Sequence, residues 1–319
     1  MKITEMRPGD NVHGFFVLRD AARKITAAGK PFLSAAVSDS SGSVEIKVWD
    51  YSGPVGPEDN GKVVKITGKV SEYRGTPQIA VDRLSLADDN DSYSIEELVP
   101  TAPIDRNAAY SGVKAMLEKL DDEEYRAVCL EMLDRMGEMF YNMPAAKSVH
   151  HAFVGGLLMH TWNMMRTADF LSGVYVSAVD RNLLIAGTFL HDLAKSREYA
   201  VSELGLVSDY TVSGRLVGHL VMGAIDVRDV CLGLGISEEK TMLLEHMVLS
   251  HHGQPEFGAA VPCQCAESEL LSYIDMIDSR MEIYAETLAK TEAGEFSERV
   301  FSLDGKRLYN HGYAEGAKE

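Results

Sequence analysis

The hydrophobic pattern of the sequence changes its period near residue 90. Before that point, β-branched and aromatic residues occur in short runs separated by turn formers such as "AAGKP", "SSGS" and "SGPVGPEDNG". Runs of this kind predict β-strands. From about residue 107 to 290, apolar residues recur instead at the i, i+3, i+4, i+7 spacing of amphipathic helices. The 319-residue chain is therefore expected to fold as a β domain followed by an all-α domain.

The first 90 residues contain five β-rich runs, which are "HGFFVLRDAARKI", "PFLSAAVSD", "SVEIKVWD", "KVVKITGKVSEY" and "PQIAVDRLSL". Five strands in so short a segment favour a small barrel, and the OB type is the usual five-stranded barrel. We predict this barrel for residues 1–90 and a polar linker for residues 91–106. A helical bundle is predicted for residues 107–290, and residues 291–319 are expected to cover it as an extended segment or short hairpin.

The charge of the chain is concentrated in its second part. The sequence has 31 Lys and Arg against 48 Asp and Glu, which gives a net charge of −17. Residues 1–90 hold 12 of each kind and are neutral, so the remainder carries the whole charge. An acidic body argues against a broad basic face that wraps duplex nucleic acid. A phosphate substrate remains compatible with it if bound metal cations supply the local positive charge.

Four cysteines are too few for a disulfide framework in a chain of this length. Cys263 and Cys265 form a C-x-C pair, but a second pair that would complete a zinc site does not lie nearby. We expect free thiols and, with them, a cytoplasmic location. The first residues lack the apolar core of a secretory signal, and no apolar run reaches the length of a membrane span, so no membrane contact is expected.

Histidines gather in the helical part, where eight of the ten lie between residues 150 and 252. A single histidine on an apolar helix face is usually a hydrogen-bonded core residue. Eight in one helical domain need many buried partners, and a metal ion can serve several at once. They fall on different predicted helices, which a bundle can direct at one point. The candidate metal-binding residues are His160, His191, Asp192, His219, His251, His252 and Asp275.

The adjacent pair His191 and Asp192 ends an otherwise apolar segment. Neighbouring residues on a helix point about 100° apart, so His191 can bind one ion while the two oxygens of Asp192 reach that ion and a second. Mixed imidazole and carboxylate ligands suit Mn²⁺, Fe²⁺, Co²⁺ or Zn²⁺, and two such ions can hydrolyse a phosphate ester. Lys195, one turn after His191, is either a phosphate contact or a helix-end lysine that satisfies the last carbonyls.

The order His160, His191 with Asp192, and then Asp275 resembles the H…HD…D signature of the HD-domain metal-dependent phosphohydrolases. With "GFFVLRDAARKI", "HHAFVGGLLMH", "LLIAGTFLHDLAK" and "MVLSHHG", the sequence also resembles the YhaM-type 3′-5′ exoribonucleases over most of its length. The resemblance implies an OB domain that holds single-stranded RNA, with single-stranded DNA as the other candidate. It further implies an HD domain that removes nucleotides from the 3′ end, with Mn²⁺ or Co²⁺ as the activator.

The resemblance also implies how two divalent ions would be held, Mn²⁺ being the first expectation. The first ion would bind His160, His191, Asp192 and Asp275. The second would bind Asp192, His219 and His251. Asp278, one turn after Asp275, is its rival for the last carboxylate position.

The remaining residues of the site are assigned by the same resemblance. Asp192, Lys195 and His252 are the expected catalytic residues. His252 is a ligand of the second ion, a group behind the ligands, or a phosphate contact. His150 and His151 would contact the substrate at the site entrance, although a place in the core or on the surface has equal weight.

Aromatic and basic residues alternate along the predicted barrel strands. OB barrels bind single strands by stacking bases on aromatic rings along a basic groove. The candidates for this role are Phe32, Trp49, Tyr73, Lys47 and Arg74. The alternative for each residue is a structural one, in which the aromatics fill the barrel and the lysines form a solvated face. Nucleic-acid binding by the whole domain is favoured chiefly by the resemblance.

Two other functions fit the same residues. The protein could be a phosphohydrolase of small nucleotides in which the barrel serves assembly, or a single-strand-binding regulator without catalysis. The complete ligand set argues against the regulator, since buried charges without partners are costly. The sequence leaves the oligomeric state open.

Overall fold

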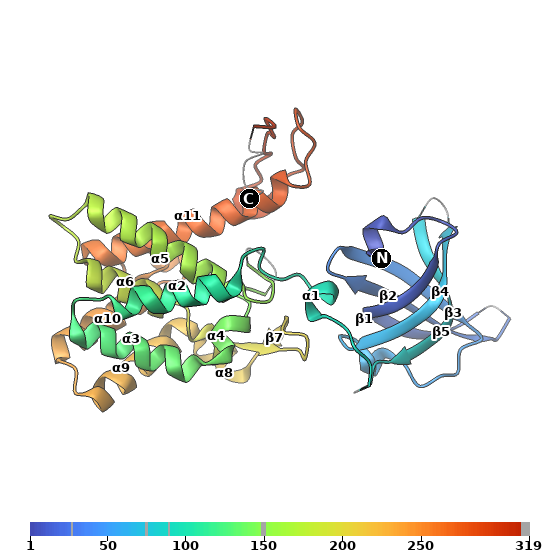
Figure 1. Ribbon diagram of the computed structural model, residues 1–319, viewed down its shortest axis with the longest axis horizontal. Coiled ribbons are helices and arrows are strands. Elements are labelled where there is room, and N and C mark those ends of the chain that lie inside the picture. The colour runs from blue at the N-terminus through green and yellow to red at the C-terminus, as the bar shows by residue number, and fades with distance from the viewer. Residues whose placement is uncertain (27, 74–75, 89, 148–150, 314–319) are drawn as a thin grey trace. The chain divides into compact units, whose positions relative to one another are not determined.

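The structure is a computed structural model that describes residues 1–26, 28–73, 76–88, 90–147 and 151–313 (Figure 1). The chain divides into two compact units. One consists of residues 1–101 with 201–206, and the other of residues 102–200 and the chain from residue 207 onward. The division after residue 101 falls inside the stretch for which the sequence predicts a linker.

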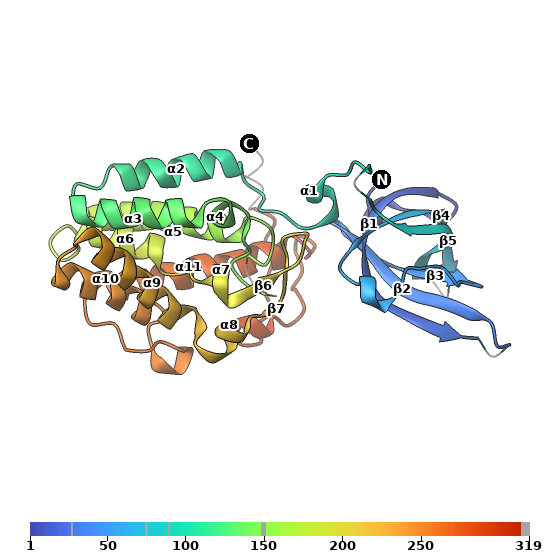
Figure 2. The ribbon, with the colours of Figure 1, turned by 90° about the horizontal axis from the view of Figure 1, so that it is seen from below.

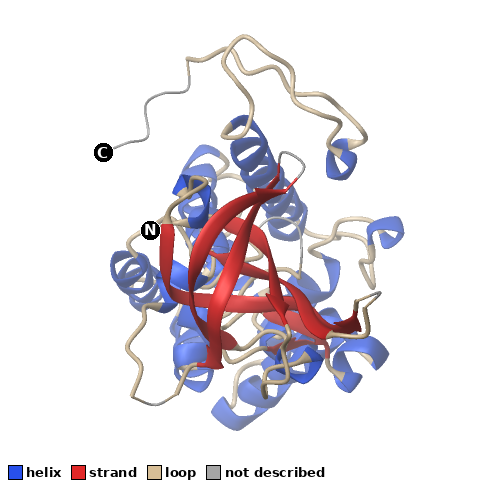
Figure 3. Ribbon diagram, turned by 90° about the vertical axis from the view of Figure 1, so that its right-hand side faces the viewer, coloured by secondary structure: helices blue, strands red, loops and turns tan. Residues whose placement is uncertain are grey.

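The first unit is a closed five-stranded barrel with the strand order β1-β2-β3-β5-β4, drawn in red in Figure 3. The strands are β1 (Asn11–Ile25), β2 (Pro31–Asp39), β3 (Gly42–Trp49), β4 (Val63–Tyr73) and β5 (Thr76–Leu86). Neighbouring strands pair antiparallel except β3 and β5, whose parallel pairing from Glu45↔Gln78 to Lys47↔Ala80 completes the ring. The predicted OB-type barrel is thereby confirmed.

The alternation along the barrel strands explains why they close around a core. In β2, Leu33, Ala35 and Val37 are buried, and the residues between them are more exposed. This period of two is the spacing at which one face of a strand meets the core. Three short helical turns complete the unit, which are η1 (Ile3–Glu5), η2 (Pro57–Asp59) and α1 (Ile95–Leu98).

The second unit is a helical bundle. Its main helices are α2 (Arg106–Glu118), α3 (Glu123–Met136), α5 (Gly156–Val174), α6 (Arg181–Leu190), α9 (Gly218–Leu234), α10 (Glu238–Ser250) and α11 (Ala266–Leu288). Shorter elements are α4 (Glu138–Asn142), α7 (Lys195–Glu198), α8 (Val212–Leu216), η3 (Pro255–Phe257), η4 (Phe301–Leu303) and the paired strands β6 (Tyr199–Val201) and β7 (Val207–Tyr210). The predicted helical domain is confirmed, and the two-stranded sheet β6-β7 is an addition that the sequence does not predict.

Helix α6 is the central helix of this bundle, in contact with α3, α5, α10 and α11 (Figure 2). Asp180 caps its N-terminus by accepting hydrogen bonds from the backbone N–H groups of Asn182 and Leu183. Every residue from Leu183 to Leu190 is buried, which accounts for its almost uniformly apolar sequence. A Cβ on Gly187 would lie 2.9 Å from Cβ of Met247, so glycine permits α6 and α10 to pack closely.

The chain after α11 packs against the end of that helix. Isolated bridges join Phe296 to Tyr309 and Val300 to Lys306. Leu303 and Leu308 are buried in a small apolar cluster with Ile283 of α11. Among the described residues, no helix is both long and apolar enough to cross a membrane.

Candidate metal centre

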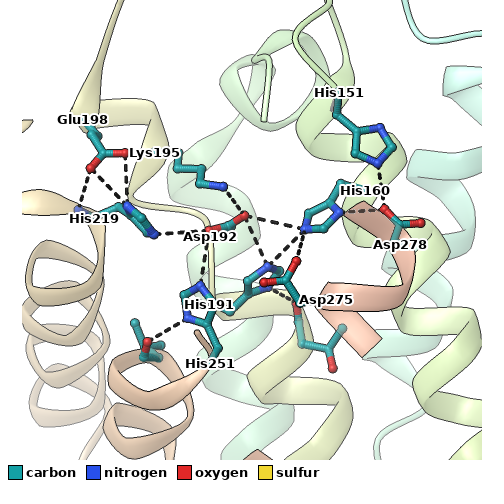
Figure 4. A network of polar contacts seen from close by, with 12 residues as sticks. His151, His160, His191, Asp192, Lys195, Glu198, His219, His251, Asp275 and Asp278 are labelled. Atoms are coloured by element: carbon teal, nitrogen blue, oxygen red, sulfur yellow. Dashed lines mark hydrogen bonds and ion pairs between the residues drawn. The ribbon is translucent and has the colours of Figure 1, made fainter. Parts of the chain in front are cut away.

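Five helices of the bundle bring imidazole and carboxylate groups to one place (Figure 4). His160 lies in α5, His191 and Asp192 directly follow α6, His219 lies in α9, His251 follows α10, and Asp275 lies in α11. Apart from His219 and Asp275, which are partly exposed, these side chains are no more than 2% exposed. Such a dense set of buried polar groups in an apolar bundle requires partners.

One half of the cluster surrounds the Oδ2 atom of Asp192. Nε2 of His191 lies 3.3 Å from this oxygen, and Nε2 of His160 lies 3.6 Å from it. Oδ1 of Asp275 lies 3.4 Å from the same nitrogen of His160. His160, His191 and Asp275 meet the spacing of a metal-binding group.

The other half faces the Oδ1 atom of Asp192. Nε2 of His219 and Nε2 of His251 each lie 3.6 Å from it. Within the described residues these three atoms are buried and have no hydrogen-bond partner. An acceptor oxygen and two ring nitrogens without partners are what a divalent cation would satisfy, because each can offer it a lone pair. The residues therefore fit a bound metal ion.

Two backbone carbonyls fix which nitrogen of the histidines faces the cluster. Nδ1 of His191 donates to the carbonyl of Thr188, and Nδ1 of His251 donates to that of Val248, each over 2.8 Å. A proton held on Nδ1 leaves Nε2 as the acceptor. Both rings therefore present a lone pair to Asp192, as metal ligation requires.

Two carboxylates orient the remaining histidines from outside the cluster. Glu198 accepts hydrogen bonds from the backbone N–H of His219 over 3.1 Å and from its Nδ1 over 3.0 Å. Asp278 is shared by two rings, since its Oδ2 lies 2.7 Å from Nδ1 of His160 and 2.7 Å from Nε2 of His151. Carboxylates in this position hold the ring and raise the basicity of its other nitrogen.

Of these two orienting groups, the sequence reasoning missed Glu198. It lies in the four-residue helix α7 and is separated from His219 by 21 positions, so no periodic signal links them. For Asp278, the sequence predicts competition with Asp275 for a metal-binding position. The structure places it against the far nitrogen of His160 and places Asp275 against the near one.

The electrostatics of the cluster favour the ligating form of Asp192 and His251, whereas for His191 burial lowers the pKa but the charge of Asp192 raises it more. Burial would raise the pKa of Asp192, but the charges of Lys195 and His191 outweigh it and hold that pKa well below its usual range. Burial lowers the pKa of His251 well below its ordinary value, and the neighbouring His191 lowers it further. A charged carboxylate and a neutral imidazole are the forms that bind metals.

Lys195 begins α7 and is bound to the cluster. Its Nζ donates to Oδ2 of Asp192 over 2.6 Å, and its side chain is only 12% exposed. Burial lowers the pKa of Lys195, but the charge of Asp192 raises it more, so the ammonium form is kept. The lysine is therefore a fixed positive charge at the carboxylate.

The structure also places the other predicted site residues. The ring centroid of His252 lies 4.5 Å from that of His251 and 5.3 Å from that of His219, and the three histidines meet the spacing of a metal-binding group. His151 is buried behind His160, in contact with Asp278. His150 lies outside the described residues.

The barrel residues predicted to bind nucleic acid are only partly grouped. Phe32 of β2 and Trp49 of β3 are opposite each other, with ring centroids 4.9 Å apart, and Trp49 is 60% exposed. Lys47 lies two residues before Trp49 on the same strand. Tyr73 is the last residue of β4, and Arg74 lies outside the described residues.

The family model of the HD domain matches residues 157–280, which include all seven candidate metal-binding residues. The 3′-5′ exoribonuclease YhaM of Bacillus licheniformis is 33% identical over 306 residues, 94% of this chain and 95% of its own. The chain belongs to the YhaM family. The YhaM exoribonucleases of Geobacillus sp. (strain WCH70) and Bacillus velezensis are 33% and 34% identical over 313 and 307 residues. These cover 96% and 94% of this chain, and 94% and 95% of the relatives.

Membership of the YhaM family agrees with both units of the structure, because the similarity extends over the barrel as well as the bundle. The HD match and the clustered histidines and aspartates together indicate divalent metal binding in the bundle.

Proposed function

We propose that this chain is a metal-dependent 3′-5′ exoribonuclease that shortens single-stranded RNA to nucleoside monophosphates. The supporting observation is the division of one buried carboxylate between two histidine groups. Oδ2 of Asp192 faces His160 and His191, and its Oδ1 faces His219 and His251. A carboxylate with ligands on both sides suits a pair of ions rather than one. The relatives named above carry the corresponding activity in their names.

The proposed ligands follow this division. One divalent ion would bind His160, His191, Oδ2 of Asp192 and Asp275. The other would bind Oδ1 of Asp192, His219 and His251, with His252 beside them. When bound, a pair of ions supplies the Lewis acidity that makes water a nucleophile at neutral pH and neutralises the phosphate. The mixed nitrogen and oxygen donor set suits Mn²⁺, Co²⁺, Fe²⁺ or Zn²⁺. Among these we propose Mn²⁺ first, because of the family resemblance.

The protein groups then position the reactants. Asp278 and Glu198 hold the imidazoles of His160 and His219 in place. Lys195 offsets the negative charge of Asp192, and its ammonium is placed to contact a phosphate oxygen at the same edge of the cluster. His252 has a buried Nδ1 without a hydrogen-bond partner among the described residues, so it can accept from the substrate or complete the second ligand set.

The barrel would hold the strand through its aromatic pair. Trp49 offers an exposed ring that Phe32 supports from the neighbouring strand. Stacking on such a ring contributes about 1–3 kcal/mol per base and tolerates any sequence. Lys47 lies on the strand of Trp49, and Tyr73 is the last residue of β4. Arg74, which lies outside the described residues, stays a candidate from the sequence. Because the barrel sequence is neutral overall, its binding should be weak and sensitive to salt.

We also propose a cytoplasmic location. All four cysteines are free thiols in the structure, two of them buried, as is usual in a reducing compartment.

The decisive experiment uses a 5′-labelled oligoribonucleotide with the full chain and Mn²⁺. We expect a ladder that shortens from the 3′ end and disappears on chelation of the metal. An intact strand beside a hydrolysed mononucleotide diester would reject the exonuclease and leave a small-nucleotide phosphohydrolase. A DNA oligonucleotide of the same sequence measures the preference between the two nucleic acids.

A further inference from the structure

A cavity of about 430 Å³ opens directly beside the metal centre. His251, His252 and Asp275 form the part of its lining that belongs to the cluster. One face of α11 continues the lining away from the cluster through Met276, Arg280 and other residues one or two turns further on. Its volume lies in the range of small-ligand sites. Whatever binds there would have one end at the metal ligands and the other along α11.

Part of the cavity wall is apolar. Phe257 of η3 lines it with a ring that is 69% exposed, and Met276 is 44% exposed. Ile283 adds an aliphatic surface about two turns after Met276 on α11. Exposed aromatic and thioether groups facing a cavity suit a flat apolar ligand such as a nucleobase. None of these three side chains has a group that could form hydrogen bonds with the edge of a base.

The polar lining supplies hydrogen-bond donors. Nη2 of Arg280 lies 3.8 Å from Oδ2 of Asp304, too far for a hydrogen bond, and Asp304 is 77% exposed. The guanidinium can therefore turn to a ligand at little cost. Hydroxyl groups of Ser279 and Ser302 also line the cavity. Donors of this kind match the oxygens of a ribose.

The C-terminal segment bounds the cavity on the side away from the cluster. Ser302 belongs to η4, and the next residue of η4, Leu303, is fully buried in a cluster with Ile283. This anchor keeps the segment at the end of the lined face. The space between the metal ligands and η4 therefore suits one nucleoside rather than a continuing strand.

We propose that this cavity binds the 3′-terminal nucleoside of the strand, with its base against Phe257 and its ribose within reach of Arg280. The proposal rests on the proposed function, and it explains how the site would act on ends: the strand enters with its last residue in the cavity and its last internucleotide phosphate at the cluster. Since the proposal places the base against apolar side chains without hydrogen-bonding groups, all four terminal nucleosides should be accepted.

The test measures binding of the reaction product as well as cleavage. Adenosine 5′-monophosphate and ribose 5-phosphate are titrated into the Mn²⁺-loaded full chain by calorimetry. Phe257→Ala should lower the affinity for adenosine monophosphate by roughly 5- to 150-fold, the range of base stacking. The affinity for ribose 5-phosphate should not change. Arg280→Gln should lower the affinity for both ligands roughly tenfold or more. Phe170→Ala is the control, because Phe170 is 71% exposed on α5 and does not line the cavity.

The outcomes separate this proposal from the function on which it rests. Equal affinity of wild type and Phe257→Ala for adenosine monophosphate would overturn the cavity assignment, even if wild-type protein shortens RNA. An equal loss of affinity for both ligands in Phe257→Ala would also overturn the cavity assignment. If wild-type protein fails to shorten RNA but shows the expected binding pattern, the cavity is a nucleotide-binding site and the proposed exonuclease activity is rejected. If Phe257→Ala raises KM for RNA cleavage and retains kcat, the result supports both the cavity assignment and the exonuclease function.

Discussion

Asp278 faces Nδ1 of His160 from 2.7 Å and so leaves the opposite nitrogen, Nε2, directed at Asp275 and Asp192. In the proposed site, Asp278 would therefore orient a ligand, whereas Asp275 would be one. The two aspartates are one turn apart on α11 and face opposite nitrogens of the same ring, Asp278 at Nδ1 of His160 and Asp275 at Nε2.

The first prediction distinguishes these two aspartates. Asp278→Asn should weaken metal binding by roughly 10- to 100-fold, because it removes the negative partner of His160. Asp275→Asn should remove a ligand and cost more affinity. Calorimetric titration with Mn²⁺ measures both, and circular dichroism checks that each variant is folded. Stronger weakening by Asp278→Asn than by Asp275→Asn would show that the assignment is reversed.

The second prediction concerns the shared carboxylate. Asp192→Ala should abolish RNA cleavage and lower the bound metal, because both histidine groups lose their common ligand. Binding of single-stranded RNA should be nearly unchanged if the barrel holds the strand. Elemental analysis and a fluorescence anisotropy titration measure the two properties. Asp169→Ala, an exposed aspartate paired with Arg181 on the bundle surface, is the control and should retain full activity.

The third prediction uses the loop that follows His251 and His252. Gly253 has a φ of +80°, and a Cβ there would lie 2.5 Å from Oγ of Ser272, so alanine is both strained and obstructed. Gly253→Ala should shift the two histidines and reduce cleavage at least tenfold. Gly233→Ala, at a helical position where a Cβ has nothing within 4 Å, should leave activity intact and stability equal or slightly higher. A fully active Gly253→Ala protein would contradict the stated geometry.

The fourth prediction is a pH dependence. Burial lowers the pKa of His246, and its Nε2 accepts a hydrogen bond from the backbone N–H of Gln264, which only the neutral ring can do. The unfolded chain protonates this ring near pH 6.5. The ring therefore contributes stability above that pH, which is lost as pH falls through the lower pKa of the folded state.

His246→Gln should accordingly flatten the fall in unfolding temperature between pH 8 and pH 5. The measurement is thermal unfolding monitored by circular dichroism at several pH values in the metal-free protein. His311→Asn, a change at an exposed histidine, should keep the wild-type slope. Parallel curves for wild type and His246→Gln would refute the prediction.

The fifth prediction tests the barrel. Trp49→Ala should weaken binding of a single-stranded oligoribonucleotide by about 1–3 kcal/mol, the contribution of one stacked base. Fluorescence anisotropy at low and moderate salt measures it. If Trp49→Ala binds as well as wild type, the strand is held elsewhere.

The sequence was informative wherever function depends on order along the chain. The turn residues between short β-rich runs predict five strands, and the sequence of histidines and aspartates predicts a shared metal centre. It could not separate Asp275 from Asp278, because residues three apart lie on the same helix face. It could not find Glu198 or the cavity beside Phe257 either, since both depend on distances between elements far apart in the chain.

The parallel pairing of β3 with β5 has a consequence for how the barrel meets other molecules. Because the ring is complete, each of its five strands pairs with a different neighbour on either side over part of its length. Strand addition, by which many sheets recruit peptides or copies of themselves, needs backbone groups that are not already paired. At Glu45–Lys47, where β3 pairs with both β2 and β5, a bound molecule must therefore be held by side chains.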